Sequence, residues 1–152
     1  MSAWLDDFSV GDKVRFGRYE VTREEVIEFA SKYDPQDIHL DDRAAADGMF
    51  GAIAASGWHT AAMTMRMQVD YWKKAGMDRA SVGAGMDELR WLRPVYPGDI
   101  LHCEAEVLEI MPSRSKPGMG RVRSRWTTYN QRDELVMSVV ALALFPRRPT
   151  EA

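Results

Sequence analysis

The sequence predicts an α+β fold in which an antiparallel sheet wraps round one long central helix. The segment from Gly57 to Trp72 is long, rich in Ala and Met, and apolar on more than one face, which is the pattern of a buried helix. Four strand-like runs follow it, and strands joined by short turns pair antiparallel. A single buried helix beside such a run of strands indicates a sheet that curls round the helix.

The chain before the central helix predicts one strand and one amphipathic helix. Lys13 to Val21 is expected to be a strand. Thr22 then begins a helix with a capping box, in which its hydroxyl accepts from the amide of Glu25 and the Glu25 carboxylate reaches back. Pro35 disfavours helical geometry at the residue before it, so this helix is predicted to end at Asp34. Its apolar face consists of Val26, Ile27, Phe29, Ala30 and Tyr33.

After the central helix, the glycine-rich sequence VGAGMD predicts a turn, and four strands follow. The sequences between the strands, YPGD, PSRSKPG and NQRDE, carry the residue types that turns favour. The strands are expected over Glu88 to Val95, Ile100 to Met111, Gly120 to Tyr129 and Leu135 to Phe145.

Length and composition indicate one domain covering residues 1–152. The chain is long enough to bury a core, and it contains no linker, internal repeat or low-complexity segment. Apolar residues make up 45% of the chain and charged residues 28%, which is ordinary for a soluble globular protein. A net charge of −3 gives no reason to expect a nucleic acid partner.

Three further features favour the cytoplasm. Cys103 is the only cysteine, which excludes an intrachain disulfide and a zinc framework and fits a reducing compartment. The acidic start MSAWLDDFSVGD lacks the basic residues and apolar run of a signal peptide. No stretch approaches the roughly 18 uninterrupted apolar residues of a membrane helix. We therefore expect a cytoplasmic protein with no membrane partner.

Asp34 and His39 are the strongest candidates for chemistry. They lie five residues apart in YDPQDIHLDDRAA, where the first helix stops and a loop leads to a short helix predicted over Asp41 to Asp47. Histidine changes its charge near neutral pH and a carboxylate can orient or activate, so the two can act on one water molecule as a general acid/base pair. The structural alternatives are that Asp34 only ends the helix and that His39 is a capping or loop residue.

Other polar residues have a structural explanation beside a functional one. His59 is expected to be a packing residue of the central helix, with contact to a substrate as the alternative. His102 and Cys103 are adjacent on a strand and so face opposite ways, which excludes a Cys–His dyad. One histidine, consecutive carboxylates and a proline do not suit a metal site, so we expect none among the acidic residues near His39, which are Asp37, Asp41 and Asp42.

The chain resembles the MaoC-like dehydratases and (R)-specific enoyl-CoA hydratases. The similarity lies in FASKYDPQDIHLDD, IAASGWHTAAMTM and LRWLRPVYPGDILHCEAEV, and it covers roughly Phe8 to Phe145. The family pattern is about D-x-N-P-x-H, followed further on by H-G or S-G. The resemblance implies a single MaoC-like hot-dog domain and an enzyme that hydrates trans-2-enoyl-CoA or dehydrates the 3-hydroxyacyl form, with (R) specificity.

The resemblance also implies a role for each matching residue. Asp34 and His39 would hold the water that adds to C3 of the enoyl thioester while a proton reaches C2. Gly57, with Ser56 before it, would bind the thioester carbonyl, because free amides at a helix start stabilise an oxyanion and glycine lets the substrate approach the backbone. No metal, flavin or nicotinamide is implied, and coenzyme A enters only as part of the substrate.

Two alternative functions stay open. A hot-dog acyl-CoA thioesterase would share the fold. Most such thioesterases carry an acidic residue on the central helix, however, and the first turns after Gly57, WHTAAMTMRMQ, lack one. A non-catalytic acyl-CoA-binding subunit is permitted by Met65, which stands where some hydratases have a serine. It is also permitted by Gln36 and Asp37, which replace the Asn-Pro of the family.

The family further implies an assembly. Its members form dimers whose sheets join edge to edge, with the site at the subunit interface. An isolated sheet has exposed edges that dimerisation satisfies. We therefore expect a homodimer or larger homo-oligomer, with an acyl-CoA thioester as the small-molecule partner.

Two groups of side chains allow either a structural or a ligand-binding interpretation. The methionines near the central helix should fill the core, or line an acyl tunnel; they are Met49, Met63, Met65, Met67 and Met86. Alternating cations on one strand should form cross-strand ion pairs with acids on the preceding strand, or bind a coenzyme A phosphate. The cations are Arg121, Arg123 and Arg125, and the acids are Glu104 and Glu106.

Overall fold

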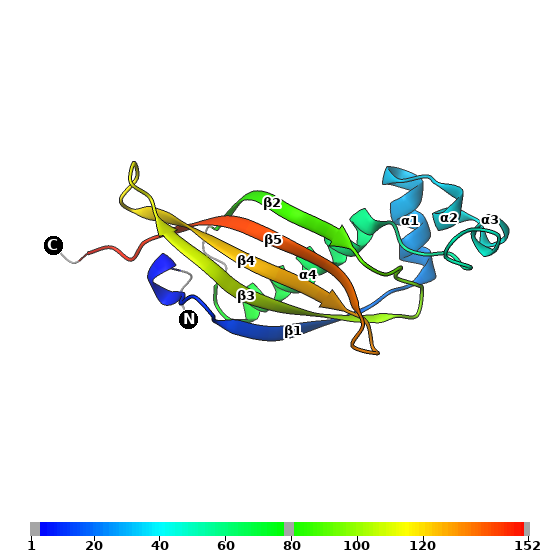
Figure 1. Ribbon diagram of the computed structural model, residues 1–152, viewed down its shortest axis with the longest axis horizontal. Coiled ribbons are helices and arrows are strands. Elements are labelled where there is room, and N and C mark those ends of the chain that lie inside the picture. Colours follow the sequence, from blue (N-terminus) through cyan, green and yellow to red (C-terminus); the bar gives the residue numbers. More distant parts are fainter. Residues whose placement is uncertain (1–3, 78–80, 151–152) are drawn as a thin grey trace.

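In the part of the chain that the structure describes, five antiparallel strands form one sheet that curves along the central helix α4 (Gly57–Lys74) (Figure 1). The computed structural model describes residues 4–77 and 81–150. The strand order is β1-β3-β4-β5-β2, so β1 and β2 are the two edges. The strands are β1 (Lys13–Glu20), β2 (Val82–Trp91), β3 (Ile100–Pro112), β4 (Met119–Tyr129) and β5 (Leu135–Pro146). The predicted α+β class is confirmed.

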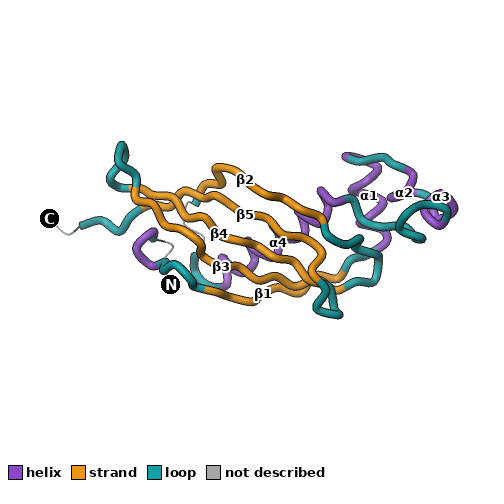
Figure 2. Tube along the Cα trace, viewed as in Figure 1, coloured by secondary structure: helices purple, strands orange, loops and turns teal. Residues whose placement is uncertain are grey.

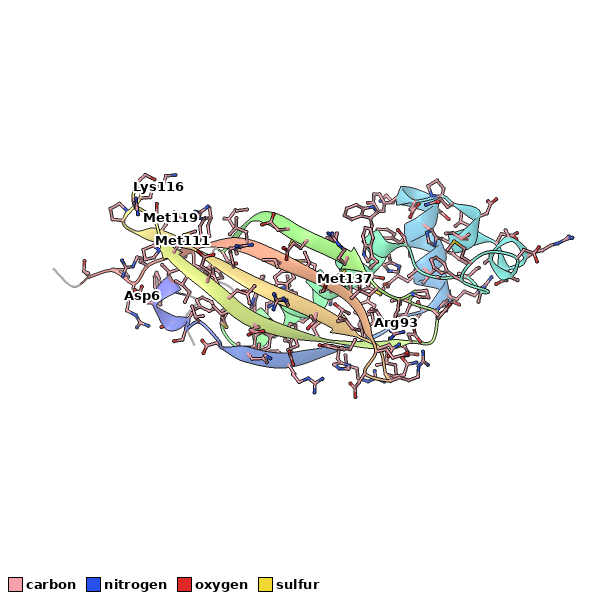
Figure 3. All side chains as sticks on the ribbon, in the orientation of Figure 1. Asp6, Arg93, Met111, Lys116, Met119 and Met137 are labelled. Carbon is pink, nitrogen blue, oxygen red and sulfur yellow. The ribbon has the colours of Figure 1, made fainter. Side chains whose placement is uncertain are left out.

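The short helices lie at the two ends of the sheet. Figure 2 shows three of them gathered at the end where α4 begins: α1 (Arg23–Tyr33), α2 (Asp37–Leu40) and α3 (Asp42–Ala46). The short 3-10 helix η1 (Leu5–Asp7) lies at the opposite end, as does the β3–β4 hairpin with Lys116 (Figure 3). The segment that contains Asp34 and His39 is therefore held beside the start of α4.

The core lies between α4 and the face of the sheet that it covers. Met63 and Met67 project from α4 into a cluster with Trp126 of β4. Burying one such side chain contributes about 1.5–3 kcal/mol, so this contact is a main attachment of the helix to the sheet. The interpretation of these two methionines as core residues is confirmed. The core interpretation is wrong for the other three, which are exposed: Met49 at 99%, Met65 at 38% and Met86 at 52%.

Helix α1 begins and ends as predicted, but one of the two hydrogen bonds predicted for its N-terminal capping box is not formed. Thr22 is the N-cap and accepts from the amide of Glu25 at 3.3 Å. The predicted return bond from the Glu25 carboxylate is wrong, because that carboxylate bonds side chains on β1 and α4 instead. Asp34 is the C-cap, and its amide donates to the carbonyl of Ala30 at 2.9 Å.

The short helix predicted over Asp41 to Asp47 is confirmed as α3, which has Asp41 and Asp47 as its caps, and a further short helix, α2, precedes it. Asp41 is extended and separates α2 from α3, and its carboxylate accepts from the amide of Ala44 at 2.8 Å. Asp42 forms two hydrogen bonds of 2.8 Å with Arg23. These two carboxylates are thus engaged in a helix cap and in an ion pair.

The prediction of a turn at VGAGMD is wrong, because β2 begins at Val82 and runs through this sequence. Gly83 and Gly85 flank a shift of register in the pairing of β2 with β5, and glycine is used inside strands at such irregularities. The strand also ends at Trp91, before the predicted end at Val95. Since β5 is the one strand among the described residues that pairs with β2, the other edge of β2 is open within one copy of the chain.

The cross-strand ion pairs expected on the outer face of the sheet are confirmed in part: Arg125 pairs with Glu106, whereas Glu104 pairs with Lys13 and Arg15 of β1. Arg123 lies 3.5 Å from Glu109 and 3.7 Å from Asp87, and Arg125 lies 4.0 Å from Glu106. Exposed pairs of this kind contribute about 0–1 kcal/mol each, so they orient side chains more than they stabilise the fold. Among the described residues Arg121 has no acidic partner within 4.0 Å.

His102 and Cys103 point to opposite faces of β3, as expected. His102 stacks on Tyr129 with ring centroids 5.4 Å apart, whereas Cys103 is fully buried in the core. Burial raises the pKa of the Cys103 thiol to about 11, so it stays protonated. No helix within residues 4–77 and 81–150 combines the length and apolarity needed to cross a membrane.

Candidate active site

The structure brings Asp34 and His39 together at the start of α4. Asp34 caps the C-terminus of α1 and His39 lies on α2, and the Nε2 atom of His39 is 3.3 Å from Oδ2 of Asp34. His39 is 5% exposed, and the Asp34 side chain is 18% exposed. The predicted pair therefore exists as a contact that is shielded from bulk water but still reachable.

The surroundings of His39 determine which of its two ring nitrogens carries a proton. Nδ1 lies 2.6 Å from the carbonyl oxygen of Ala54, and because a carbonyl only accepts, Nδ1 must carry a proton. Nε2 is then the nitrogen that can gain and lose a proton beside Asp34. The backbone before α4 thus fixes both the ring orientation and the tautomer.

Asp34 accepts two further hydrogen bonds that hold it in the charged form. The side-chain amide of Gln36 donates to Oδ1 at 2.6 Å, and the hydroxyl of Ser56 donates to Oδ2 at 2.7 Å. The bond from Gln36, followed by that from Ser56, lowers the pKa of Asp34 in spite of its partial burial. Gln36 stands at the Asn position of the motif, and its amide braces the carboxylate directly.

Ser56 has a different partner from the expected one. The sequence places it among the residues that bind the thioester, but its side chain is fully buried and its single proton is committed to Asp34. It is the N-cap residue of α4, yet its side chain makes no capping bond with the helix. The amides of the first turn of α4 therefore keep their donor capacity, and carry the partial positive charge of a helix start.

Gly57 lies against an aromatic ring. A Cβ atom at this position would be 2.5 Å from the indole of Trp91, so only glycine fits while the ring stays in place. Trp91 also meets Trp58 edge-on at 5.1 Å. Glycine at position 57 thus allows Trp91, at the end of β2, to pack against the start of α4. The sequence did not indicate this requirement for glycine.

A cavity of about 280 Å³ lies beside this point, with His39, Gly57, Thr60 and Trp91 in its wall. Of the acid/base pair only His39 lines it, and Met65, further along α4, lies outside it. The cavity therefore lies between His39 and the start of α4. A substrate carbonyl and a reacting carbon could therefore be held in one place.

Comparisons with known proteins identify the family. A family model described as a MaoC like domain matches residues 7–130. The uncharacterized protein YdeM of Bacillus subtilis is 33% identical over 131 residues, which cover 85% of this chain and 89% of YdeM. The 3-hydroxyacyl-thioester dehydratase Z of Mycobacterium tuberculosis is 31% identical over 91 residues, which are 59% of this chain and 60% of that protein.

A solved structure agrees with the sequence matches. The MaoC-like dehydratase from Rhodospirillum rubrum superimposes with a TM-score of 0.88 at 42% sequence identity, covering 97% of this chain and 99% of that chain. The superposition confirms the hot-dog arrangement of sheet and helix that the motifs implied. Because the family match extends over most of its length, the chain belongs to the MaoC-like domain family.

Proposed function

We propose that this protein is an enzyme that interconverts trans-2-enoyl-CoA and (3R)-hydroxyacyl-CoA by adding or removing water. The observation that carries the proposal is the contact between Asp34 and His39 beside the start of α4. The similarity to a protein named as a 3-hydroxyacyl-thioester dehydratase supports the reaction class.

His39 moves the proton in this mechanism. Its Nδ1 is bound to the carbonyl of Ala54, so Nε2 takes a proton from the attacking water. The water oxygen bonds to C3 and the electrons of the C2–C3 double bond shift toward the thioester oxygen. The electrons then return to form a bond between C2 and the proton held on Nε2. One water molecule is added across the double bond, and the imidazole is regenerated.

Asp34 and the helix start stabilise the charges that develop. Asp34 remains ionised because Gln36 and Ser56 donate to it, and its charge favours the imidazolium that forms on His39. The first amides of α4, at Gly57, face the developing oxyanion. Only water and protons are exchanged, so the reaction uses no cofactor beyond the coenzyme A of the substrate. The proposal includes a cytoplasmic location, as the sequence led us to expect.

The proposal includes a homodimer joined through the open edge of β2. This strand exposes apolar side chains, with Val82 at 56% and Met86 at 52% exposure, and an unpaired edge with such side chains is a template for another strand. Trp91 at the end of β2 packs on Gly57, so pairing through this edge would bring a second copy close to the site.

The test is an absorbance assay at the enoyl-thioester band with short, medium and branched enoyl-CoA substrates. We expect loss of the band with the wild-type protein, and no loss with His39→Ala. Release of free thiol from saturated acyl-CoA would identify a thioesterase instead. A protein that binds acyl-CoA but leaves every enoyl substrate unchanged would be a binding subunit.

A further inference from the structure

A second cluster of polar side chains joins three elements behind the candidate site. His59, in the first turn of α4, is 2% exposed, and its Nε2 lies 3.1 Å from Oε1 of Glu25 on α1. The hydroxyl of Tyr19 on β1 donates to the same oxygen at 2.5 Å. One carboxylate oxygen thus ties β1 and α4 to α1.

His59 also holds α1 through its ring. The imidazole stacks on Phe29 with centroids 4.7 Å apart and an angle of 8° between the planes. Glu25 and Phe29 are four residues apart on α1, and so lie on the same face of that helix. His59 therefore contacts α1 at two points on one face.

The far end of α1 is Asp34, which is held by the same turn of α4. Ser56 donates to Asp34 at 2.7 Å, and Ser56 and His59 are three residues apart, on one side of α4. The start of α4 therefore contacts α1 at two places. His59 contacts the N-terminal part of α1, and Ser56 contacts the C-cap residue of α1. A shift of α1 would therefore change the position of the Asp34 carboxylate.

The polar ring of His59 is not explained by packing. Its Nδ1 is buried and has no hydrogen-bond partner among the described residues, which lowers stability. A phenylalanine would fill the same space without that unpaired nitrogen. Natural chains keep such a locally unfavourable group where it has another use.

The hydrogen bond between Tyr19 and Glu25 persists over a wide pH range. Partial burial opposes ionisation of Glu25, but the bonds from Tyr19 and His59 outweigh it and lower the pKa of this carboxyl group. Burial, and then the bond to Glu25, raises the pKa of Tyr19 to about 12. Glu25 is thus a charged acceptor and Tyr19 a neutral donor across the physiological range.

We infer that His59 is a positioning residue, which holds α1 through Glu25 and Phe29 so that Asp34 keeps its place beside His39 and Ser56. The effect on rate rests on the proposed function. The effect on Asp34 itself does not.

The first test compares His59→Phe with His59→Gln. Phenylalanine keeps the stacking on Phe29 and removes the donor to Glu25, whereas glutamine can return a donor near the Nε2 position. We expect His59→Phe to lower kcat by about tenfold to a hundredfold, as small misplacements of a catalytic group do. KM should change less than about twofold, because substrate binding is not altered. The melting temperature should be equal or higher, and His59→Gln should recover most of the lost activity.

His102→Phe is the matched control. His102 also stacks on an aromatic ring and lies 3.2 Å from a carboxylate, that of Asp133, but it is on β3, and its partners Tyr129 and Asp133 are not part of α1. Its loss should leave kcat unchanged. If His59→Phe lowers activity and melting temperature together, and His59→Gln restores neither, the residue has only a structural role and the inference is wrong.

The second test needs no substrate. The titration of Asp34, followed by carbon-13 NMR of its carboxyl group, should move to higher pH in His59→Phe, because the bonds from Gln36 and Ser56 would loosen. An unchanged titration would overturn the inference. If the wild-type protein turned over no enoyl thioester but the titration moved, the proposed function would fail and the positioning role would stand.

Discussion

The chemistry available at the candidate site depends on which nitrogen of His39 is free. The carbonyl of Ala54 occupies Nδ1, and Asp34 faces Nε2. Asp34 in turn accepts from Gln36 and Ser56, which keep it ionised. One residue is thus poised to exchange a proton, and the other to remain charged. The proposed addition of water to an enoyl thioester needs one residue of each kind, a proton carrier and a fixed charge beside it.

We expect Asp34→Asn and His39→Ala each to lower kcat/KM for enoyl-CoA hydration by at least about a hundredfold, a typical share for positioned proton transfer. Both variants should keep the wild-type circular dichroism spectrum, since neither residue belongs to the core cluster. Asp37→Asn, an exposed acid in the same segment, is the control and should retain full activity. Near-normal turnover by either site variant would refute the assignment.

Ser56→Ala should change the pH dependence of activity. The bond from Ser56 favours the charged form of Asp34, so its loss raises the pKa of Asp34 toward the usual carboxyl value of about 3.9. The acid limb of the profile of kcat/KM against pH should therefore move to higher pH. An acid limb that stays in place would show that Asp34 does not control it.

The same variant makes a prediction about stability. A lowered pKa in the folded state stabilises the fold above the unfolded pKa, and this contribution is lost as pH falls through the folded value. Ser56→Ala should thus be less stable than the wild type at neutral pH, and the difference in the free energy of unfolding should shrink in strong acid. Urea unfolding at several pH values would measure it.

At the scale of residues, the spacing of Asp34 and His39 and the family motif were enough to predict the pair. The donors to Asp34 were not predictable in their roles. Gln36 is close in sequence, but the direction of its amide depends on the turn after α1. Ser56 lies 22 residues from Asp34, and only the packing of α1 against α4 brings them together.

At the scale of elements, the start of α4 is where most features of the site meet. Gly57 begins the helix, Trp91 of β2 packs on it, and the cavity with His39 opens beside it. The helix itself was predictable from its apolar pattern. The strand β2 was not, because two glycines in an edge strand resemble a turn when their pairing with β5 is unknown.

Gly57→Ala tests whether the glycine serves the substrate or only Trp91. The new Cβ would lie 2.5 Å from the Trp91 ring, so the ring must move. We expect kcat/KM to fall by about a hundredfold or more, on the scale of a lost oxyanion donor. In a double-mutant cycle, Gly57→Ala with Trp91→Ala should stay impaired relative to Trp91→Ala alone. Full recovery in the double variant would mean that the glycine only makes room for the ring.

At the scale of the whole molecule, the two edge strands of the sheet, β1 and β2, differ in the side chains that they carry. The β1 edge carries charged pairs, with Lys13 3.7 Å from Glu104 and Arg15 3.5 Å from the same residue. The β2 edge instead exposes apolar side chains beside an unpaired backbone. Charged edges discourage pairing with another chain and apolar edges favour it, so the proposed dimer is joined through β2 and not through β1.

Val82→Lys with Met86→Lys should therefore separate the proposed dimer. Lysine on an edge strand blocks pairing with a second strand. Light scattering after gel filtration should give about twice the chain mass of 17.3 kDa for the wild type and the chain mass itself for the double variant. Val10→Lys, at a side chain 65% exposed elsewhere on the surface, is the control and should not change the mass.

The activity of the monomeric double variant tests whether the second copy of the chain contributes to the candidate site. Trp91 lies at the end of the same strand and packs on Gly57, so loss of pairing should free its ring and disturb the helix start. We expect the monomeric double variant to stay folded but to lose hydration activity by about tenfold or more, the scale on which small displacements at a site act. A monomer with full activity would show that one copy of the chain forms the complete site. The open edge would then serve assembly alone.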